Sequence, residues 1–157
     1  MLTLYHAPMS RSSRIVTLID ELGAPVEIRE VTIPRQDGSG GRDAANPHPE
    51  GKVPLLDHDG AIVWETPAII LYLTDMFPAA GLGPLPGDPL RGPYLSWLAW
   101  YGDVVEPVLI LDRVVKVEHP VITATFRSMA EVVDRLTRAL EKGPWLLGER
   151  YSAADLL

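Results

Sequence analysis

Hydroxyl side chains gather directly after the first apolar segment of the chain. Ser10 and Ser12 follow the break at residues 7–9 and precede a stretch with helical periodicity. Unpaired N–H groups at a helix N-terminus favour anions. A Ser10 hydroxyl at such a position is able to donate a hydrogen bond to a bound thiolate. The competing interpretation is a plain N-terminal cap with solvated neighbours.

The chain contains no cysteine. Disulfides, cysteine-based zinc sites and redox chemistry with a protein thiol are therefore excluded. Any thiol that reacts here must belong to a cofactor or a substrate. The four histidines are scattered without ligand spacing, so we predict no metal site.

A second candidate site is the segment at 51–54, where Lys52 and Val53 lead into Pro54. A cis Val53–Pro54 bond would turn the Val53 backbone outward and offer its N–H and C=O to an extended peptide. Cis is adopted by only ~5–6% of X–Pro bonds. We predict the cis bond, because docking of an extended peptide needs this outward backbone edge; the alternative is an ordinary trans proline at the start of a strand.

A third candidate is the pair Glu65 and Thr66, which precedes Pro67 at the start of a predicted helix. A helix N-terminus with a hydroxyl cap suits a carboxylate, and an adjacent acidic side chain suits an ammonium group. Together they match the two charges of an α-amino-acid head group. The alternative is a capped helix whose acidic neighbour complements the helix dipole.

The elements that must position these residues follow from periodicity and turn signals. The first half predicts the order β-α-β, then a loop containing at most a short helix, then β-β-α, which is the thioredoxin-like order. The strands are expected at 2–5, 26–31, 53–56 and 61–64. The helices begin at Ser10 and Thr66, with Ile15, Leu18, Ile19 and Leu22 on the core side of the first and Ile69, Ile70, Leu73 and Met76 on that of the second.

Strand signals nearly stop after a Pro- and Gly-rich linker, and the remaining pattern is helical. Pro107 is expected to kink or divide a helix at 94–115. Apolar stripes run along Leu95, Leu98, Tyr101 and Val105, and then along Phe126, Met129, Val133, Leu136 and Leu140. We therefore predict an α/β thioredoxin-like domain at 1–78, a linker at 79–88 and an all-helical domain at 89–157.

Composition narrows the function classes. A net charge of -7 argues against a nucleic-acid partner. No apolar run approaches the ~20 residues of a membrane span, and the start of the chain lacks the features of a signal peptide. These features favour a cytoplasmic protein without a membrane partner.

The ordered set of these segments resembles the cytosolic glutathione transferase superfamily, in its bacterial type with a serine in the first turn. The resemblance rests on residues 4–5, 10–14, 21–23, 46–47, 51–56 and 65–73, and on 148–155 in the second domain. It implies glutathione as cosubstrate, a small electrophile as second substrate and a homodimer. Thr66 stands where the superfamily usually has serine, which keeps the hydroxyl.

The resemblance also implies roles for individual residues. Ser10 corresponds to the thiol-activating residue of the first turn, with Ser12 as second choice, whereas Tyr5 comes too early for a tyrosine-type site. Lys52, Val53, Pro54, Glu65 and Thr66 are expected to bind glutathione. Met9, Trp97 and Tyr101 are candidates for the electrophile pocket; for the two aromatic residues, core or dimer packing is the alternative.

Three functions are consistent with these residues. The first is a glutathione transferase; the others are a non-catalytic binding or interaction protein with the same fold, and a glutathione-dependent isomerase or dehalogenase. Ser152 and Asp155 form a capping-box pattern near the last residue, Leu157. Because a one-turn helix does not offset its nucleation cost, this pattern predicts a longer natural chain, with a partner chain over the apolar helical faces as the alternative.

Overall fold

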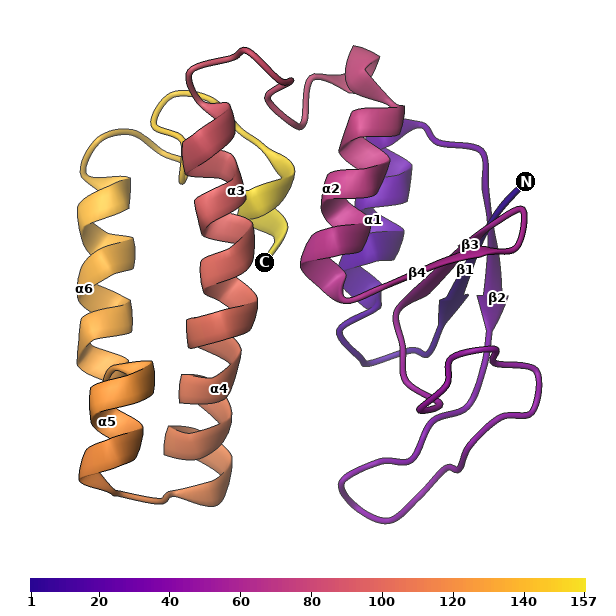
Figure 1. Cartoon of the computed structure of the whole chain (residues 1–157), viewed down its shortest axis with the longest axis horizontal. Coiled ribbons are helices and arrows are strands. Elements are labelled where there is room, and N and C mark those ends of the chain that lie inside the picture. The colour runs from indigo at the N-terminus through magenta and orange to yellow at the C-terminus, as the bar shows by residue number, and fades with distance from the viewer. The chain divides into compact units, whose positions relative to one another are not determined.

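The computed structural model describes all 157 residues, and the chain forms two compact units. The first comprises Met1–Ala80 and the second Gly81–Leu157 (Figure 1). Each unit has its own secondary-structure class, and each is described by itself below.

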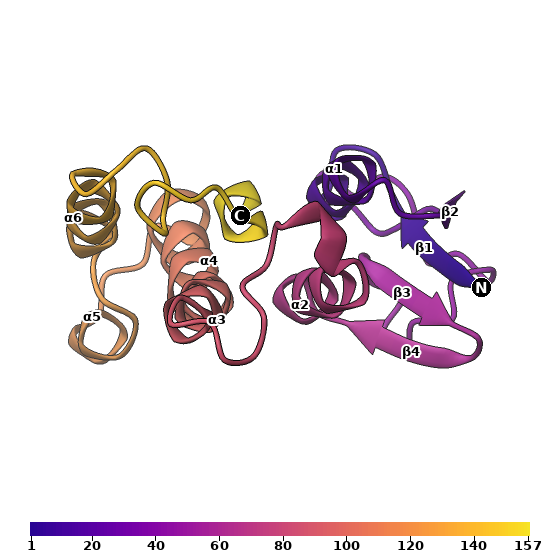
Figure 2. The ribbon, with the colours of Figure 1, turned by 90° about the horizontal axis from the view of Figure 1, so that it is seen from above.

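The first unit is a four-stranded sheet with two helices on one face (Figure 2). Its strand order is β2-β1-β3-β4; β1 pairs in parallel with β2 and antiparallel with β3, and β3 pairs antiparallel with β4. This is the thioredoxin-like arrangement predicted from the sequence. The elements are β1 (Leu2–His6), α1 (Ser13–Leu22), β2 (Val26–Glu30), β3 (Leu55–His58), β4 (Ala61–Trp64), α2 (Thr66–Met76) and the 3-10 turn η1 (Pro78–Ala80).

Helix α1 begins three residues later than predicted. Ser12, not Ser10, is its N-cap, and its side chain makes no capping hydrogen bond. The turn at 8–12 has hydrogen bonds of its own, which hold Ser10 outside the helix. The C-terminal prediction is confirmed, because Gly23 caps the helix at φ 60, in the left-handed region that glycine adopts without a Cβ penalty.

Helix α2 differs from the prediction in its N-cap and in one of its four predicted core residues. Its N-cap is Glu65 rather than Thr66, because Thr66 already has helical geometry. Three of its four predicted core residues, Ile69, Ile70 and Leu73, are fully buried. Met76 lies in the last turn, beyond the sheet, and is 37% exposed.

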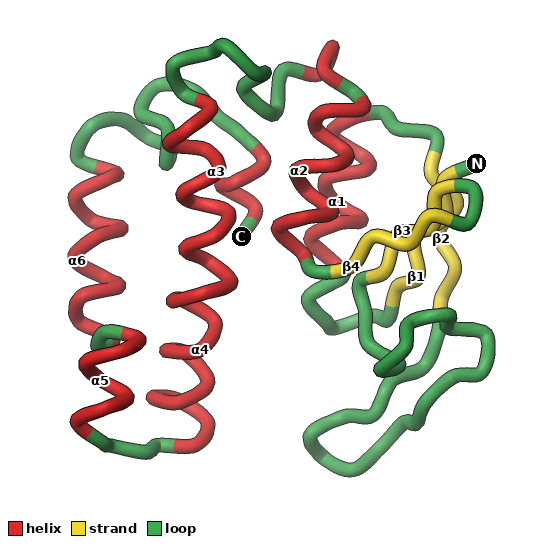
Figure 3. Tube along the Cα trace, in the orientation of Figure 1, coloured by secondary structure: helices red, strands yellow, loops and turns green.

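Strand β3 begins at Leu55, two residues later than predicted, and extends through His58. The hairpin turn is consequently tighter, and the N–H of Gly60 donates to Asp57 Oδ1 at 2.7 Å. A long loop connects β2 to β3 without a regular helix (Figure 3). The sheet and this loop together hold the turn at 8–12 and the segment at 51–54 in one unit.

The second unit is all-helical. Its elements are α3 (Arg91–Trp100), the π-helical turn η2 (Tyr101–Val105), α4 (Glu106–Leu109), the π-helical turn η3 (Ile110–Val115), α5 (Pro120–Phe126), α6 (Met129–Leu140) and the 3-10 helix η4 (Ala153–Leu156). The segments α3 and α4 run alongside α5 and α6 (Figure 1). No helix of the chain combines the length and the apolar character that a bilayer crossing requires.

Pro107, which was expected to kink or divide a helix at 94–115, lies in the first turn of α4, directly after the π-helical turn η2. The preceding turn is π-helical, and the N–H of Glu106 donates to the Tyr101 carbonyl five residues earlier. A wider turn relieves the clash that a proline ring makes with the carbonyl four residues before it. The helical segment therefore continues through α4.

The structure buries only part of the stripe predicted at 126–140. Val132 is buried with Val104 and Val108, whereas the predicted Val133 is 54% exposed. Val132 and Val133 each lie three or four residues from Met129 and from Leu136, so helical spacing alone allows either valine on this face. Packing against Val104 and Val108 selects Val132. Leu140 is likewise exposed, and Leu95 is 38% exposed on α3.

The capping box predicted at the last helix is present. Asp155 accepts hydrogen bonds from the N–H and the hydroxyl of Ser152, at 3.0 and 3.2 Å. Its other carboxylate oxygen accepts the N–H of Leu146 at 2.8 Å. Asp155 therefore fixes both the start of η4 and the loop before it.

Candidate functional site

A polar cavity of about 570 Å³ opens in the first unit between the turn after β1 and the loop before β3. Its size falls within the ordinary range for small-ligand clefts. It is lined by Met9, Ser10, Arg11, Ile33, Pro34, Arg35, Gln36, Asp37, Lys52 and Val53. Four residues singled out from the sequence, Met9, Ser10, Lys52 and Val53, thus meet at one site.

Of the two candidate serines, Ser10 lines the cavity and Ser12 is fully buried. The Ser10 hydroxyl donates to the Ala7 carbonyl at 2.7 Å and lies 2.7 Å from Ser12 Oγ. Ser12 Oγ accepts the N–H of Ala7 at 3.2 Å and lies 2.7 Å from His6 Nδ1. The geometry therefore gives Ser10 access to a ligand and gives Ser12 an interior role.

His6 also belongs to this cluster, although no motif or spacing marked it as a site residue. It is the last residue of β1, and its ring reaches back to the turn through the bond with Ser12. Burial lowers the pKa of His6 below its ordinary value of 6.5, while the carboxylate of Glu30 on β2 acts in the opposite direction. The neutral ring is therefore favoured near pH 7.

Positive charge borders the cavity at Arg35 and Lys52. The Arg35 guanidinium donates to the carbonyls of Pro8 and Met9, at 2.7 and 3.1 Å, and so fastens the long loop to the first turn. Lys52 was predicted from the sequence as a binding residue, whereas Arg35 was not. A single arginine in an irregular Pro- and Gly-rich loop has no periodic context that could mark it.

The Val53–Pro54 peptide bond is cis, as predicted. Neither the N–H nor the C=O of Val53 forms a hydrogen bond within the chain. The loop beside it is held by Asn46, whose amide donates to the Lys52 carbonyl at 3.0 Å. His48 continues this support, accepting the N–H of Glu50 at Nδ1. The Val53 backbone is thus free to pair with an extended ligand.

Glu65 and Thr66 do not line the cavity itself. Strand pairing nevertheless places them near it, because Trp64 pairs with Leu55, the residue after Pro54. Glu65 has φ 69 and ψ 126, a conformation costly for any residue with a Cβ. The Thr66 hydroxyl forms no hydrogen bond within the chain. Strain and a free hydroxyl at a helix start are features expected of a binding position.

The remaining pocket candidates fall in both units. Met9, in the first, is 92% exposed and has a positive φ of 53. Trp97 and Tyr101 are in the second unit, where Trp97 packs edge-on against Trp100 and both rings contact the Arg135 guanidinium. Tyr101 is buried and its hydroxyl donates to Glu106. Within their own unit the two aromatic residues thus have packing partners.

No group of three or more His, Cys, Asp or Glu side chains is arranged to hold a metal ion. The cavity lining combines the Ser10 hydroxyl and backbone amides with three cationic side chains, Arg11, Arg35 and Lys52, and one carboxylate, Asp37. Such a set suits an anionic, peptide-like ligand.

The chain is similar to known proteins in sequence and in fold. The family model "Glutathione S-transferase, N-terminal domain" matches residues 1–75. Protein LigF of a Sphingobium species is 43% identical over 54 residues, which cover 34% of this chain and 21% of LigF. The chain therefore spans about a fifth of that relative.

Two solved structures extend the likeness over the whole chain. A glutathione transferase from Methylococcus capsulatus is 29% identical with a TM-score of 0.76, covering 99% of this chain and 78% of that protein. A sphingomonad glutathione S-transferase, complexed with glutathione, is 28% identical with a TM-score of 0.74, covering 98% and 77%. With the thioredoxin-like sheet and the helical second unit, these matches define the class. The chain belongs to the cytosolic glutathione transferase superfamily.

Proposed function

We propose that the chain binds glutathione in the cavity of its first unit and activates the glutathione thiol for attack on a small electrophile. The observation that carries this proposal is the position of Ser10, which places a hydroxyl on the cavity wall beside the free backbone of Val53. The solved sphingomonad relative with bound glutathione supports the choice of ligand.

In this proposal glutathione lies extended along the Val53 backbone. Its cysteine residue pairs with the free N–H and C=O of Val53, in the manner of an added strand. The γ-glutamyl head lies at the start of α2, where Thr66 and the helix N-terminus hold the carboxylate and Glu65 holds the ammonium group. Lys52 and Arg35 attract the glycine carboxylate at the other end.

The chemistry then follows from the position of the thiol next to Ser10. The thiol releases its proton to water, and the Ser10 hydroxyl donates a hydrogen bond to the thiolate, which stabilises the charged form. Sulfur forms a bond to the electrophilic carbon while the leaving group departs with its electron pair. The chain's role is to bind, orient and hold the sulfur as a thiolate.

A homodimer in the cytoplasm completes the proposal. An apolar depression of about 510 Å³ on the first unit is lined by Val63, Ala68, Leu71, Tyr72, Asp75 and Met76. Trp64, on the adjoining strand, is 51% exposed. Exposed apolar surface of this kind marks interaction sites, and a second copy of the chain is the proposed occupant. Light scattering of wild type and Met76→Glu tests this point, with a monomer expected for the variant.

The function is tested by glutathione titration calorimetry followed by a panel of electrophiles. The panel contains an aryl halide, an isothiocyanate, a haloacid and a cis-enone, so that substitution, addition, dehalogenation and isomerisation are each sampled. Conjugation that falls in Ser10→Ala and persists in Ser13→Ala supports a transferase. Glutathione binding without turnover of any compound indicates the non-catalytic alternative, and absence of glutathione binding contradicts the proposal.

A further inference from the structure

Three side chains form a continuous polar chain from the end of β1 to the cavity. His6 Nδ1 lies 2.7 Å from Ser12 Oγ, and Ser12 Oγ lies 2.7 Å from Ser10 Oγ. Only the last member, Ser10, lines the cavity. Both contacts are as short as good hydroxyl hydrogen bonds, so each must contain one proton.

The direction of these bonds follows from counting protons. A serine hydroxyl has a single proton, and a neutral imidazole nitrogen either donates or accepts. If His6 Nδ1 is bare, Ser12 must donate to it, and Ser10 must then donate to Ser12. In that arrangement the Ser10 proton lies in the hydrogen bond to Ser12, and Ser10 has no proton left to donate to a ligand.

If Nδ1 has the proton, His6 donates to Ser12. In the free protein the Ser10 hydroxyl donates to the Ala7 carbonyl at 2.7 Å, so the proton between the two serines must come from Ser12. The Ser10 proton is then left for the Ala7 carbonyl or for a ligand. That carbonyl loses this donor when the Ser10 proton turns to a ligand, because Ser12 already donates its one proton to Ser10. One tautomer of His6 therefore frees the Ser10 proton, and the other withholds it.

We propose that His6 is a positioning residue that donates from Nδ1 to Ser12 and thereby directs the Ser10 hydroxyl toward the sulfur of bound glutathione. This inference rests on the proposed function for its ligand, but the direction of the donor chain is a property of the protein alone. His6 does not touch the ligand; it acts through Ser12 and Ser10.

The surroundings of His6 agree with this role. Its backbone pairs with β2, where Glu30 lies opposite, and its carbonyl accepts the N–H of Val31 at 2.8 Å. The ring is therefore held at a fixed position relative to the turn. Both the neutral Nδ1–H ring and the imidazolium donate to Ser12, so the proposed direction does not require His6 to be charged.

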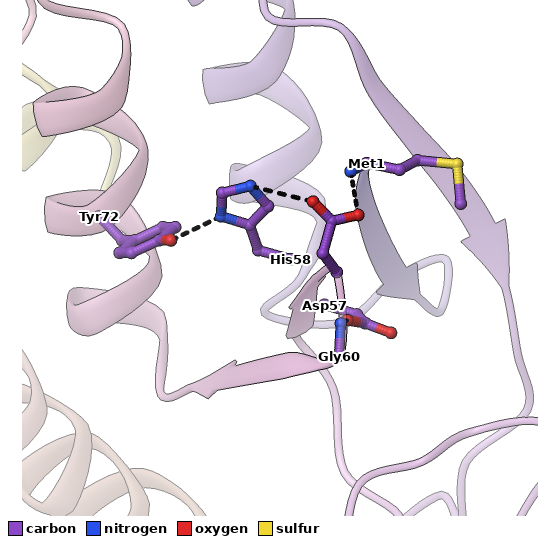
Figure 4. Close-up of polar contacts among 6 residues, drawn as sticks. Met1, Asp57, His58, Gly60 and Tyr72 are labelled. Atoms are coloured by element: carbon purple, nitrogen blue, oxygen red, sulfur yellow. Dashed lines mark hydrogen bonds and ion pairs between the residues drawn. The ribbon is translucent and has the colours of Figure 1, made fainter.

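His58 supplies a matched control in the same unit. Its Nδ1 lies 2.7 Å from a hydroxyl, that of Tyr72, and its ring is likewise partly buried (Figure 4). Its Nε2 faces Asp59 at 3.8 Å, and the N-terminal amine pairs with the same carboxylate. None of these groups lines the cavity. Replacement of His58 removes a comparable bond without touching the Ser12–Ser10 chain.

The first test is independent of glutathione. Nitrogen-15 shifts of the His6 ring in the free protein report which nitrogen has the proton. The Nδ1–H tautomer supports the proposal, even if glutathione fails to bind and the proposed function falls. The Nε2–H tautomer overturns the proposal whatever the outcome for glutathione.

The second test compares the pKa of the bound glutathione thiol, read from thiolate absorbance against pH. Loss of the hydrogen bond from His6 to Ser12 should weaken the next bonds in the chain, including that from Ser10 to the thiolate, by about 10–30%. Because the whole Ser10 bond is expected to shift the pKa of the thiol by about 1–2, His6→Leu should raise this pKa by about 0.1–0.6. His6→Asn, whose amide nitrogen occupies the place of Nδ1, should restore the wild-type value. His58→Leu should leave it unchanged.

A double-mutant cycle separates positioning from general damage to the fold. In a Ser10→Ala background, His6→Leu should produce no further rise, because the residue through which it acts is absent. An equal effect of His6→Leu with and without Ser10, or no effect in either background, would refute the relay while leaving glutathione binding intact.

Discussion

Ser10 Oγ lies 2.7 Å from Ser12 Oγ, yet only Ser10 borders the cavity, while Ser12 is fully buried. Two adjacent hydroxyls of the same type therefore have different access to a ligand. The sequence placed both at the start of a helix and left the choice between them open. The site is defined by which hydroxyl the turn exposes.

Removal of the Thr66 hydroxyl should weaken glutathione binding. Under the proposed function this hydroxyl holds the γ-glutamyl carboxylate, and a hydrogen bond to a charged group contributes about 1.5–3 kcal/mol. Thr66→Ala should therefore raise the dissociation constant about 10- to 150-fold, measured by calorimetry. Thr66→Ser keeps the hydroxyl and serves as control; equal affinity of Thr66→Ala and wild type would contradict the assignment.

Glu65 should affect stability through its backbone conformation and glutathione binding through its side chain. At its positive φ a glycine is unstrained, whereas alanine keeps the strain of a Cβ. Glu65→Gly is therefore expected to have a free energy of unfolding about 1 kcal/mol higher than that of Glu65→Ala. This is the reverse of the usual helix propensity, in which alanine is favoured over glycine. Both variants should lose glutathione affinity to the same extent. Greater stability of the alanine variant would show that the backbone relaxes at this position.

The ion pair of Asp88 and Arg150 should make the second unit sensitive to acid. Asp88 accepts the N–H of Leu90 at 2.8 Å and the guanidinium of Arg150 at 2.6 Å, and these contacts lower its pKa below the ordinary 3.8. Its stabilising contribution is thus present above pH 3.8 and is lost as the pH falls through the lowered value.

Asp88→Asn should accordingly melt below wild type at pH 7, and the difference should vanish at a pH well under 3.8. The measurement is thermal unfolding followed by circular dichroism across this range. A difference that stays constant with pH would show that the carboxylate charge contributes nothing.

Asp155 should anchor the end of the second unit. It accepts hydrogen bonds from Ser152 and, through its other oxygen, from the N–H of Leu146. Capping interactions contribute about 0.5–2 kcal/mol, so Asp155→Ala should lower the free energy of unfolding by that amount or slightly more. Asp134→Ala, which removes an exposed pair with Arg138, is the control and should have little effect. Equal losses in the two variants would argue against the capping box.

The sequence predicted the succession of strands and helices along the first unit, because apolar periodicity, turn signals and Gly23 mark these elements locally. It misplaced the start of α1 because the hydrogen bonds of the turn at 8–12, made by Ser10 and Ser12, compete with helix formation. Val133 was wrongly placed in the core because its spacing from Met129 and Leu136 fits a helix face as well as that of Val132, and only packing with another helical segment decides between them. Such long- and medium-range effects leave no periodic signal.

Only part of the candidate site could be predicted from the sequence, for the same reason. Ser10, Lys52 and Val53 stand in short ordered motifs, and the fold brings them to one cavity. His6 and Arg35 reach the site through contacts across 6 and 26–27 residues of sequence. No pattern in the segments around His6 and Arg35 predicts these contacts, so only the three-dimensional structure places the two residues at the site.

The most direct test of the account is the pKa of the glutathione thiol when bound to the wild-type chain, read from thiolate absorbance between pH 5 and 10. A free thiol titrates at about 8.5. The account predicts a clearly lower value for the bound thiol and a rise of about 1–2 in Ser10→Ala, with glutathione still bound. A bound thiol that titrates like free glutathione, or a value that Ser12→Ala changes and Ser10→Ala does not, would contradict the central role of Ser10.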